Sequence, residues 1–379
     1  MKRTGHRGFA DAKPWLLLAV LVVPQRRPAI EIKDFDFVES KEQKRTMQIR
    51  ALKADLFKPE DIFLLDAPRV LAWGKARKPF EISGQTGVMN SNSQDLEIRT
   101  ATKVLTPDGF EFKTRNLSYE ATTQSLAGED PVEMRSSGAA RRGSKLRLTG
   151  VGVRISLEKN LYEILRNVIA EQTVSPRNTL TVRSQRAEIS PENNQAAFHR
   201  EVTVKSTKLD LRGESLLVYF ADSQPQKLVL GSKLPGAASA PESRIQAALD
   251  GLNIRSQGLE VAFNEAGDVR ESQAFGNVLA DTSDGTRLKA QKLQSDLSEG
   301  KQRLRLEGNV TIETGTRVAT CEQALFFPET GDIYLERVAS VKSGEQVLEG
   351  EKIRFSTRNS EVRVEGARGQ VGRKQLGLR

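Results

Sequence analysis

Apolar and polar residues alternate along most of this chain with a period of two. From Leu96 to Val104 every second residue is Leu, Ile, Thr or Val, and the residues between them are charged or small. A polar turn at 106–109 leads into the alternating sequence 110–113, and the same pattern returns over 303–312. Such alternation gives each strand one apolar and one charged face. It predicts an all-β protein built of many short strand-turn-strand units.

The clearest repeats lie between Leu252 and Ala367. Val278, Val310 and Val338 are 28 to 32 residues apart, and the first two complete a Gly-Asn-Val sequence. We expect each of these valines to follow a strand and to precede a turn. One hairpin-like unit of this length cannot bury its apolar face alone, so the repeats must stack on their neighbours.

The interruptions of the pattern divide the chain into six segments. They are a signal- or anchor-like leader (1–29), a β domain (30–175), a first group of repeats (176–231), a loop or linker (232–247), a second group of β-repeats (248–367) and a disordered basic tail (368–379). The linker is placed where Ser232–Ser243 is rich in Pro, Gly, Ala and Ser and lacks periodicity. Isoleucine and valine favour a strand over a helix for Tyr162–Val168.

The leader has the composition of an export signal or a membrane anchor. Basic residues precede the apolar run Trp15–Val23, and Pro24 followed by two arginines ends it. The run is about half of the roughly 20 residues that a membrane-crossing helix needs. A cleaved signal, a retained anchor and a buried N-terminal segment are the three alternatives.

Composition restricts the class of protein. In 379 residues only 6% are aromatic and 28% are charged, which predicts a thin, elongated core. The net charge of +9 suits acidic partners such as anionic lipid or nucleic acid. The basic residues alternate with leucines, as on strand surfaces, and the phenylalanines fall on the apolar face, so nucleic-acid binding is not favoured.

Little in the sequence supports catalysis. A single cysteine, Cys321, excludes an internal disulfide, and with only His6 and His199 a histidine cluster for metal binding is also excluded. No nucleophile motif, P-loop or dinucleotide fingerprint occurs. We therefore expect no enzyme activity, no catalytic residue, no metal and no cofactor, with Cys321 acting as a small packing residue and His199 as a half-exposed residue near a strand end.

Two parts of the chain resemble known families. Phe80–Leu161 resembles the LptC proteins of lipopolysaccharide export, above all over Gly109–Tyr119 and Leu148–Val153. The stretch from Asn178 to Gly366 is similar to LptA/OstA-like repeats, which begin strands as at Gly276-Asn277-Val278 and Glu307-Gly308-Asn309-Val310. LptC proteins have a fuller membrane anchor and normally end after one domain, so this chain resembles a fusion of the two kinds.

The resemblance implies a fold, a function and partners. The fold is an open, antiparallel, V-shaped β-jellyroll (β-taco) with an apolar groove. The function is that of a periplasmic lipopolysaccharide-transport bridge that shields the lipid A acyl chains. The implied partners are an inner-membrane Lpt ABC transporter and LptA/LptD-type β-jellyrolls joined end to end by strand addition, with the leader as a candidate inner-membrane anchor.

The alternation selects the residues expected to line the groove: Leu96, Ile98, Phe110, Phe112, Leu117, Tyr119, Leu304, Leu306, Val310 and Ile312. Two alternatives remain open at this point. These residues could be an ordinary core sealed from ligand, and the protein could be an exported structural β-solenoid that carries no lipid.

Overall fold

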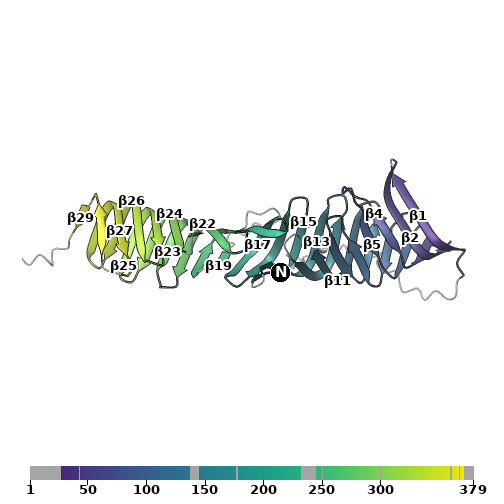
Figure 1. The fold of residues 1–379 in the computed structure, drawn as a ribbon, viewed down its shortest axis with the longest axis horizontal. Helices are drawn as coiled ribbons and strands as arrows, with labels where there is room; N and C mark the ends of the chain where they lie inside the picture. Colours follow the sequence, from purple (N-terminus) through teal and green to yellow (C-terminus); the bar gives the residue numbers. More distant parts are fainter. Residues whose placement is uncertain are drawn as a thin grey trace, which may run out of the picture.

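The computed structural model is a long, narrow rod in which the strands lie across the long axis and follow one another from end to end (Figure 1). It describes residues 27–41, 43–136, 145–175, 178–231, 245–249, 251–298, 301–358, 361–366 and 368–370. Within these ranges no residue is helical, and the strands pair antiparallel. The predicted all-β jellyroll class is confirmed.

The strands of the described residues form one sheet. Those of the N-terminal half are β1 (Ile30–Lys41), β2 (Lys44–Phe57), β3 (Ile62–Asp66), β4 (Arg69–Ala72), β5 (Phe80–Ser83), β6 (Thr86–Asn90), β7 (Leu96–Arg99), β8 (Thr102–Leu105), β9 (Phe110–Thr114), β10 (Leu117–Glu120), β11 (Ser125–Ser136), β12 (Leu146–Ser156), β13 (Leu161–Ser175), β14 (Asn178–Ser184) and β15 (Arg186–Ser190). Those of the C-terminal half are β16 (Gln195–Lys205), β17 (Leu209–Ala221), β18 (Gln224–Gly231), β19 (Ile245–Leu249), β20 (Leu252–Ser256), β21 (Gly258–Phe263), β22 (Val269–Thr282), β23 (Arg287–Ser298), β24 (Lys301–Thr314), β25 (Arg317–Phe327), β26 (Asp332–Ser343), β27 (Gln346–Ser356), β28 (Val362–Glu365) and β29 (Arg368–Gln370).

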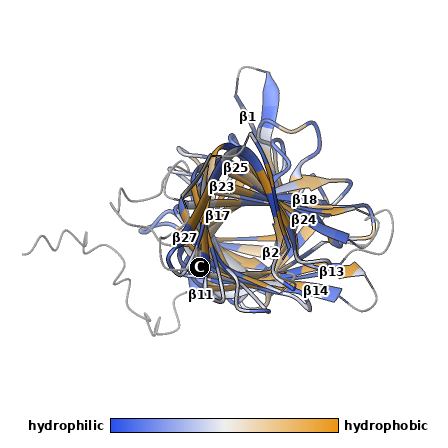
Figure 2. Cartoon of the chain, turned by 90° about the vertical axis from the view of Figure 1, so that its left-hand side faces the viewer, coloured by the Kyte–Doolittle hydropathy of each residue, from blue (hydrophilic) through white to orange (hydrophobic). Residues whose placement is uncertain are grey.

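A line of bulges, which we call the corner, divides this sheet lengthwise. The register of β24 against β25 shifts between Glu307 and Val310, and similar shifts recur from β11 to β27. On one side lies wall A, made mainly of residues 96–99, 117–128, 153–164, 186–199, 216–231, 258–275, 292–298, 301–307, 323–336, 352–358 and 361–365. On the other side lies wall B, made mainly of residues 102–114, 131–136, 145–149, 168–175, 178–184, 202–213, 245–249, 251–256, 278–290, 310–321 and 339–349. Seen end on, the walls face each other (Figure 2), and the buried hydrophobic residues of both walls form one cluster.

The corner explains the Gly-Asn repeats. Gly308 and Asn309 have φ angles of 79° and 50°, in the left-handed region that glycine and asparagine adopt most readily. Val310 then returns to the strand and is 1% exposed. The prediction that such valines precede a turn is therefore wrong, because they lie inside long strands just after the corner.

The third repeat differs from the first two in its register. Arg337 and Val338 have φ angles of 62° and 54°, so they occupy the corner positions that Gly and Asn hold elsewhere. Val338 is 84% exposed, whereas Ala339 is 2% exposed and is the structural counterpart of Val310. The repeat spacing predicts Val338 at that place, and the structure has Ala339 there.

The predicted strand over 96–104 is also interrupted by the corner. Thr100 and Ala101, both with positive φ, separate β7 from β8 and are exposed. Because the corner consists of two residues, the even-numbered residues point inward both before and after it. Ile98 and Thr102 are accordingly only 2% and 1% exposed.

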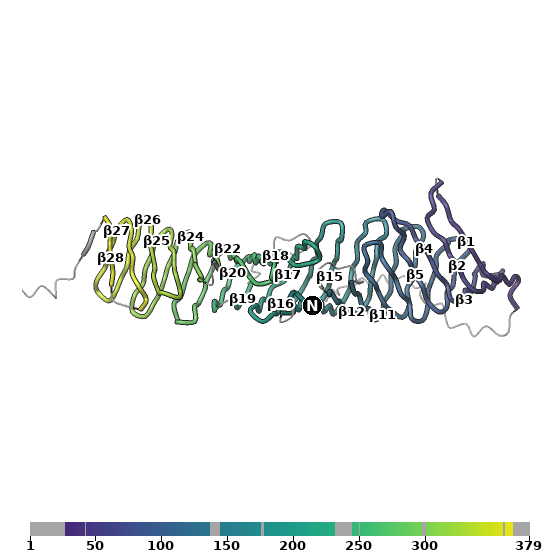
Figure 3. Tube along the Cα trace, in the orientation of Figure 1, coloured from purple at the N-terminus to yellow at the C-terminus, as the bar shows by residue number. Residues whose placement is uncertain are grey.

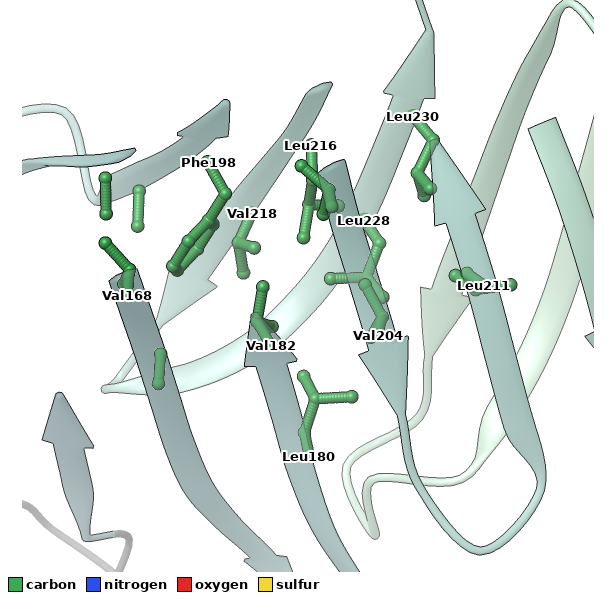
Figure 4. Close-up of a cluster of buried hydrophobic side chains, with 14 of the residues drawn as sticks. Val168, Leu180, Val182, Phe198, Val204, Leu211, Leu216, Val218, Leu228 and Leu230 are labelled. Carbon is green, nitrogen blue, oxygen red and sulfur yellow. The ribbon is translucent and has the colours of Figure 1, made fainter. Parts of the chain in front are cut away.

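Apolar burial between the walls forms the core. One cluster of buried residues runs from Phe35 to Phe355. In its middle part, shown in Figure 4, wall A contributes Phe198 and Leu216 and wall B contributes Val182 and Val204, and their side chains point toward one another. Ion pairs such as Arg147 to Glu133 cover the outer faces, where exposure to solvent weakens them.

The sheet continues across the predicted domain boundaries. β13 pairs with β14 in wall B and with β15 in wall A, so the boundary at 175/176 falls in a hairpin. The strand predicted over Tyr162–Val168 is confirmed as part of β13. Residues 232–244 lie outside the described ranges, but Ile245 already begins β19, so the predicted linker is three residues too long at its C-terminal end.

The two ends of the chain complete this picture. Arg368–Gln370 forms β29 and pairs with β27, so the prediction of disorder is wrong for these three residues, and 371–379 lie outside the described ranges. At the other end β1 pairs with β2, and this hairpin projects from the rod (Figure 3). Of the predicted leader, residues 1–29, the description includes only 27–29, and no described segment is a helix that could span a membrane.

Candidate functional site

The ten residues predicted for the groove lie along the interior between the two walls. Wall A carries Leu96, Ile98, Leu117, Tyr119, Leu304 and Leu306, and wall B carries Phe110, Phe112, Val310 and Ile312. The first stretch, 96–119, belongs to the N-terminal half of the rod and the second, 304–312, to the C-terminal half (Figure 1). The structure therefore places them in two separate stretches of one interior.

In this conformation the walls are closed over these residues. Nine of the ten are at most 3% exposed, and Phe110 alone is half-buried. Burial raises the pKa of Tyr119 to about 12, and the nearby carboxylates of Glu39 and Asp95 act in the same direction. Because these side chains are buried, an acyl chain could reach most of this interior only if the walls parted.

An aromatic cluster fills the interior of the N-terminal half. The ring of Tyr162 meets the rings of Phe80, Phe110 and Phe112 edge to face, with centroid distances of 6.4, 6.1 and 5.5 Å. Burial raises the pKa of the Tyr162 hydroxyl above its ordinary value, so this group stays neutral and acts as a hydrogen-bond donor.

The edge opposite the corner, which we call the mouth, is where hairpin tips of the two walls meet. Asp108 lies on a tip of wall B, and Asn160 and Tyr162 lie at a tip of wall A. The Tyr162 hydroxyl is 2.8 Å from Asp108 Oδ2 and 2.7 Å from Asn160 Oδ1, and Asn160 Nδ2 donates to Asp108 Oδ2 at 2.9 Å. These three residues join the two walls by polar contacts.

Other contacts cross the mouth further along the rod. Gln172 Nε2 of wall B donates to the carbonyl oxygen of Ser223 in wall A at 2.6 Å. Further cross-mouth contacts join Lys75 Nζ to Glu192 Oε2 at 2.8 Å, Lys75 N to Leu157 O at 3.2 Å, Lys208 Nζ to Asp268 Oδ1 at 3.7 Å and Arg317 Nη1 to Ser356 O at 3.2 Å. The closed state thus depends on a few polar contacts as well as on apolar packing.

One cleft of about 330 Å³ opens at the mouth. Its lining joins wall B residues Asp108, Gly109, Phe110, Ser136, Leu146, Leu148 and Gln172 to wall A residues Ile189, Ser190, Pro191, Asn194, Gln195, Ala196, Phe198, Phe220 and Ser223. Of the residues predicted for the groove, only Phe110 lines it.

Sequence reasoning missed most residues of the mouth. Asp108 was recognised only as part of a turn, and Tyr162 only as part of a strand. No local signal links them, because they are 54 residues apart in the chain. Acidic and amide side chains in hairpin turns are too common to identify such a contact.

The remaining candidates for chemistry have structural roles. Cys321 is 6% exposed, and burial raises its pKa to about 12. The His199 side chain is 13% exposed, its Nε2 is 3.8 Å from Glu188 Oε1, and burial lowers its pKa. Among the described residues no group of three His, Cys, Asp or Glu side chains could hold a metal ion.

Two facing walls with a continuous apolar interior define a two-walled β-jellyroll. Residues 17–172 match the profile of the family "Lipopolysaccharide-assembly, LptC-related", and residues 181–361 match that of the family "LptA/(LptD N-terminal domain) LPS transport protein". The chain therefore combines an LptC-related domain with an LptA/LptD N-terminal domain, in this order.

No curated protein matches this sequence. Among solved structures, the chain is similar to the crystal structure of LptH, the LptA homologous periplasmic component of the lipopolysaccharide transport device of Pseudomonas aeruginosa. The identity is 16%, the match covers 30% of this chain and 80% of that chain, and the TM-score is 0.27. The fold described here rests on the strand pairings and not on this likeness.

Proposed function

We propose that this protein is a periplasmic component of lipopolysaccharide transport that shields lipid acyl chains between walls A and B. The observation that carries the proposal is the single apolar cluster from Phe35 to Phe355, which runs through both family domains beneath charged outer faces. In this proposal the ten interior residues named above contact the acyl chains, and the sugar-phosphate head group stays in water.

The energetics favour such a role. Burying a methylene group is worth about 0.8 kcal/mol, so a chain of about twelve carbons gains on the order of 8–10 kcal/mol on leaving water. A chain that enters between the walls replaces contacts of one wall with the other by contacts with lipid, so little interior surface becomes exposed to water. Breaking a cross-mouth hydrogen bond costs only about 0.5–1.5 kcal/mol. The gain therefore exceeds the cost of parting the walls locally.

The ends of the rod are suited to joining similar proteins. β1 at one end and β28 and β29 at the other are the terminal strands of the described sheet, and unpaired strand edges bind further strands readily. We propose that LptA- or LptD-type jellyrolls dock there and extend the interior. The chain itself has no catalytic role in this proposal, so direction comes from an inner-membrane ABC transporter, near which the leader would hold the protein.

Photo-crosslinking tests this function. A photoreactive residue at Phe112 or Leu306, both at most 1% exposed, is expected to capture lipopolysaccharide. Matched controls at the neighbouring positions Glu111 and Arg305, whose side chains belong to the outer face, are expected not to do so. Equal capture from both faces would refute the assignment of the interior.

A structural scaffold is the second candidate, and the near-complete burial of the interior favours it. It predicts that lipopolysaccharide is captured at neither Phe112 nor Leu306. It also predicts that the protein purified from its native envelope carries no lipid in mass spectrometry.

A further inference from the structure

The cleft at the mouth lies between two cross-mouth contacts. Asp108, which contacts Tyr162 and Asn160, borders one end, and the hydrogen bond from Gln172 to Ser223 borders the other. Its wall B side lies within the LptC-related domain, and its wall A side lies within the LptA/LptD N-terminal domain. The cleft is thus built by both domains where they meet.

The lining changes from polar to apolar with depth. At the surface lie Ser136, Ser190, Asn194, Gln195 and Ser223, all at least partly exposed. At the bottom lie Leu148, Ile189, Ala196 and Phe198, which are at most 5% exposed. These deep residues belong to the same apolar cluster as the rest of the interior, so the cleft is continuous with the space between the walls.

The chemistry of the lining selects the kind of ligand. Among the described residues that line it, Asp108 alone is charged, so these residues offer no cation to a phosphate or a carboxylate. The bordering strands β12, β13 and β16 are each paired on both sides, so they offer no free edge to an extended peptide. A hydrocarbon chain attached to an uncharged, hydroxyl- or amide-bearing group matches both the apolar bottom and the polar rim.

We infer that this cleft binds one acyl chain of an amphipathic lipid and is a side opening to the interior at the junction of the two domains. Its volume of about 330 Å³ is at the lower end of the roughly 300–1,000 Å³ of ligand pockets, which fits one chain better than a multi-chain lipid. The inference rests on the proposed function, since it gives the interior a route by which a chain enters from the side.

A photoreactive lipid tests the side opening. The probe is a glucosamine acylated with a chain of about twelve carbons that carries a diazirine at its far end, and the labelled positions are mapped on the full-length protein by mass spectrometry. We expect labelling of the peptides that contain Leu148 and Phe198. Phe220→Asp puts a charge on the half-buried side of the cleft and is expected to lower this labelling at least about tenfold, since a cost of about 1.4 kcal/mol is already sufficient.

Two further variants complete the test. Leu279→Asp, on an outer face with 46% exposure, is the matched control and should leave the labelling unchanged. Ala196→Trp fills the bottom of the cleft and should also lower the labelling. It tests the side opening independently of any effect of Phe220→Asp on the fold.

The outcomes separate this inference from the proposed function. Labelling near Leu306 without labelling of the cleft would overturn the side opening and leave the lipid-shielding function standing. Junction labelling that survives both Phe220→Asp and Ala196→Trp would also overturn the side opening. Absence of labelling anywhere in the interior would overturn both.

Discussion

The N-terminal and C-terminal halves of the rod build the same two walls from different strands. From β3 to β10 each strand has four or five residues and ends at the corner, so every wall strand is a separate element. From β22 to β27 each strand has 11 to 14 residues and passes through the corner at a bulge. In both arrangements the apolar side chains point inward on either side of the corner. The fold therefore requires this orientation of the side chains, but it does not require that the strands be continuous.

The two halves also differ at the mouth. The N-terminal half is closed by the Tyr162 aromatic cluster and by the polar contacts of Asp108, whereas the cross-mouth contacts named for the C-terminal half are the ion pair of Lys208 with Asp268 and the hydrogen bond from Arg317 to the carbonyl oxygen of Ser356. Because more interactions must break in the N-terminal half, we expect its walls to part less readily than those of the C-terminal half.

The largest effect should come from removing the centre of the aromatic cluster. Phe112→Ala is expected to lower the free energy of unfolding by about 3–5 kcal/mol, because the ring is 1% exposed and packs 5.5 Å from Tyr162. Urea unfolding measures the change. Leu306→Ala is the matched interior variant of the other half, and Leu52→Ala, at a residue with 65% exposure, should cost less than about 0.5 kcal/mol. A smaller loss for Phe112→Ala than for Leu306→Ala would contradict the comparison.

A second effect should follow from releasing the mouth of the N-terminal half. Asp108→Ala is expected to cost about 1–2 kcal/mol, since it removes the carboxylate that contacts Tyr162 and accepts from Asn160. Hydrogen exchange should become faster at the hairpin tips 106–109 and 157–160.

Two companion variants sharpen that prediction. Tyr162→Phe keeps the ring and removes the hydroxyl, so it should reproduce only part of the Asp108→Ala effect. Arg317→Ala removes one cross-mouth hydrogen bond of the other half and should speed exchange in the C-terminal half alone. Exchange that rises equally in both halves after Asp108→Ala would show that the mouth opens as one unit.

The corner offers a stabilising substitution. Val338 has a φ of 54° and is 84% exposed, so a β-branched residue is strained there without any compensating burial. Val338→Asn is expected to stabilise the protein by about 1 kcal/mol, which a rise in the unfolding midpoint would reveal. Val318→Asn, at an exposed position of β25 without positive φ, is the control and should give no such gain. An equal gain from both substitutions would contradict the explanation that Val338 is strained by its positive φ.

The smallest effect concerns pH. Burial lowers the pKa of His199 below its ordinary value of 6.5, and the positive charges of Arg186 and Arg200 act in the same direction against Glu188. His199 therefore binds a proton more readily in the unfolded chain than in the folded one. Its contribution to the stability of the fold is complete above about pH 6.5 and falls as the pH drops below that value. His199→Gln should weaken the pH dependence of the free energy of unfolding between pH 7 and 5, measured by urea titration at each pH. An unchanged pH dependence would mean that other groups cause it.

Several features of the fold and the interior could be read from the sequence. The alternation at 303–312 places Leu304, Leu306, Val310 and Ile312 on the inner face, as the structure has them. The corner could not be located, because Gly308 and Asn309 signal it in one repeat while Arg337 and Val338 replace them in another. The side cleft could not be predicted either, since its residues come from positions 108 to 223 and share no motif.

The sequence by itself determined which side of each strand is apolar, because a period of two is a local property of neighbouring residues. Only the tertiary structure decided where the sheet bends and how the mouth closes. Those features depend on contacts such as that of Asp108 with Tyr162 and that of Gln172 with Ser223, which join residues 54 and 51 positions apart. Such pairs meet only once the stacked hairpins have set the distance between the two walls.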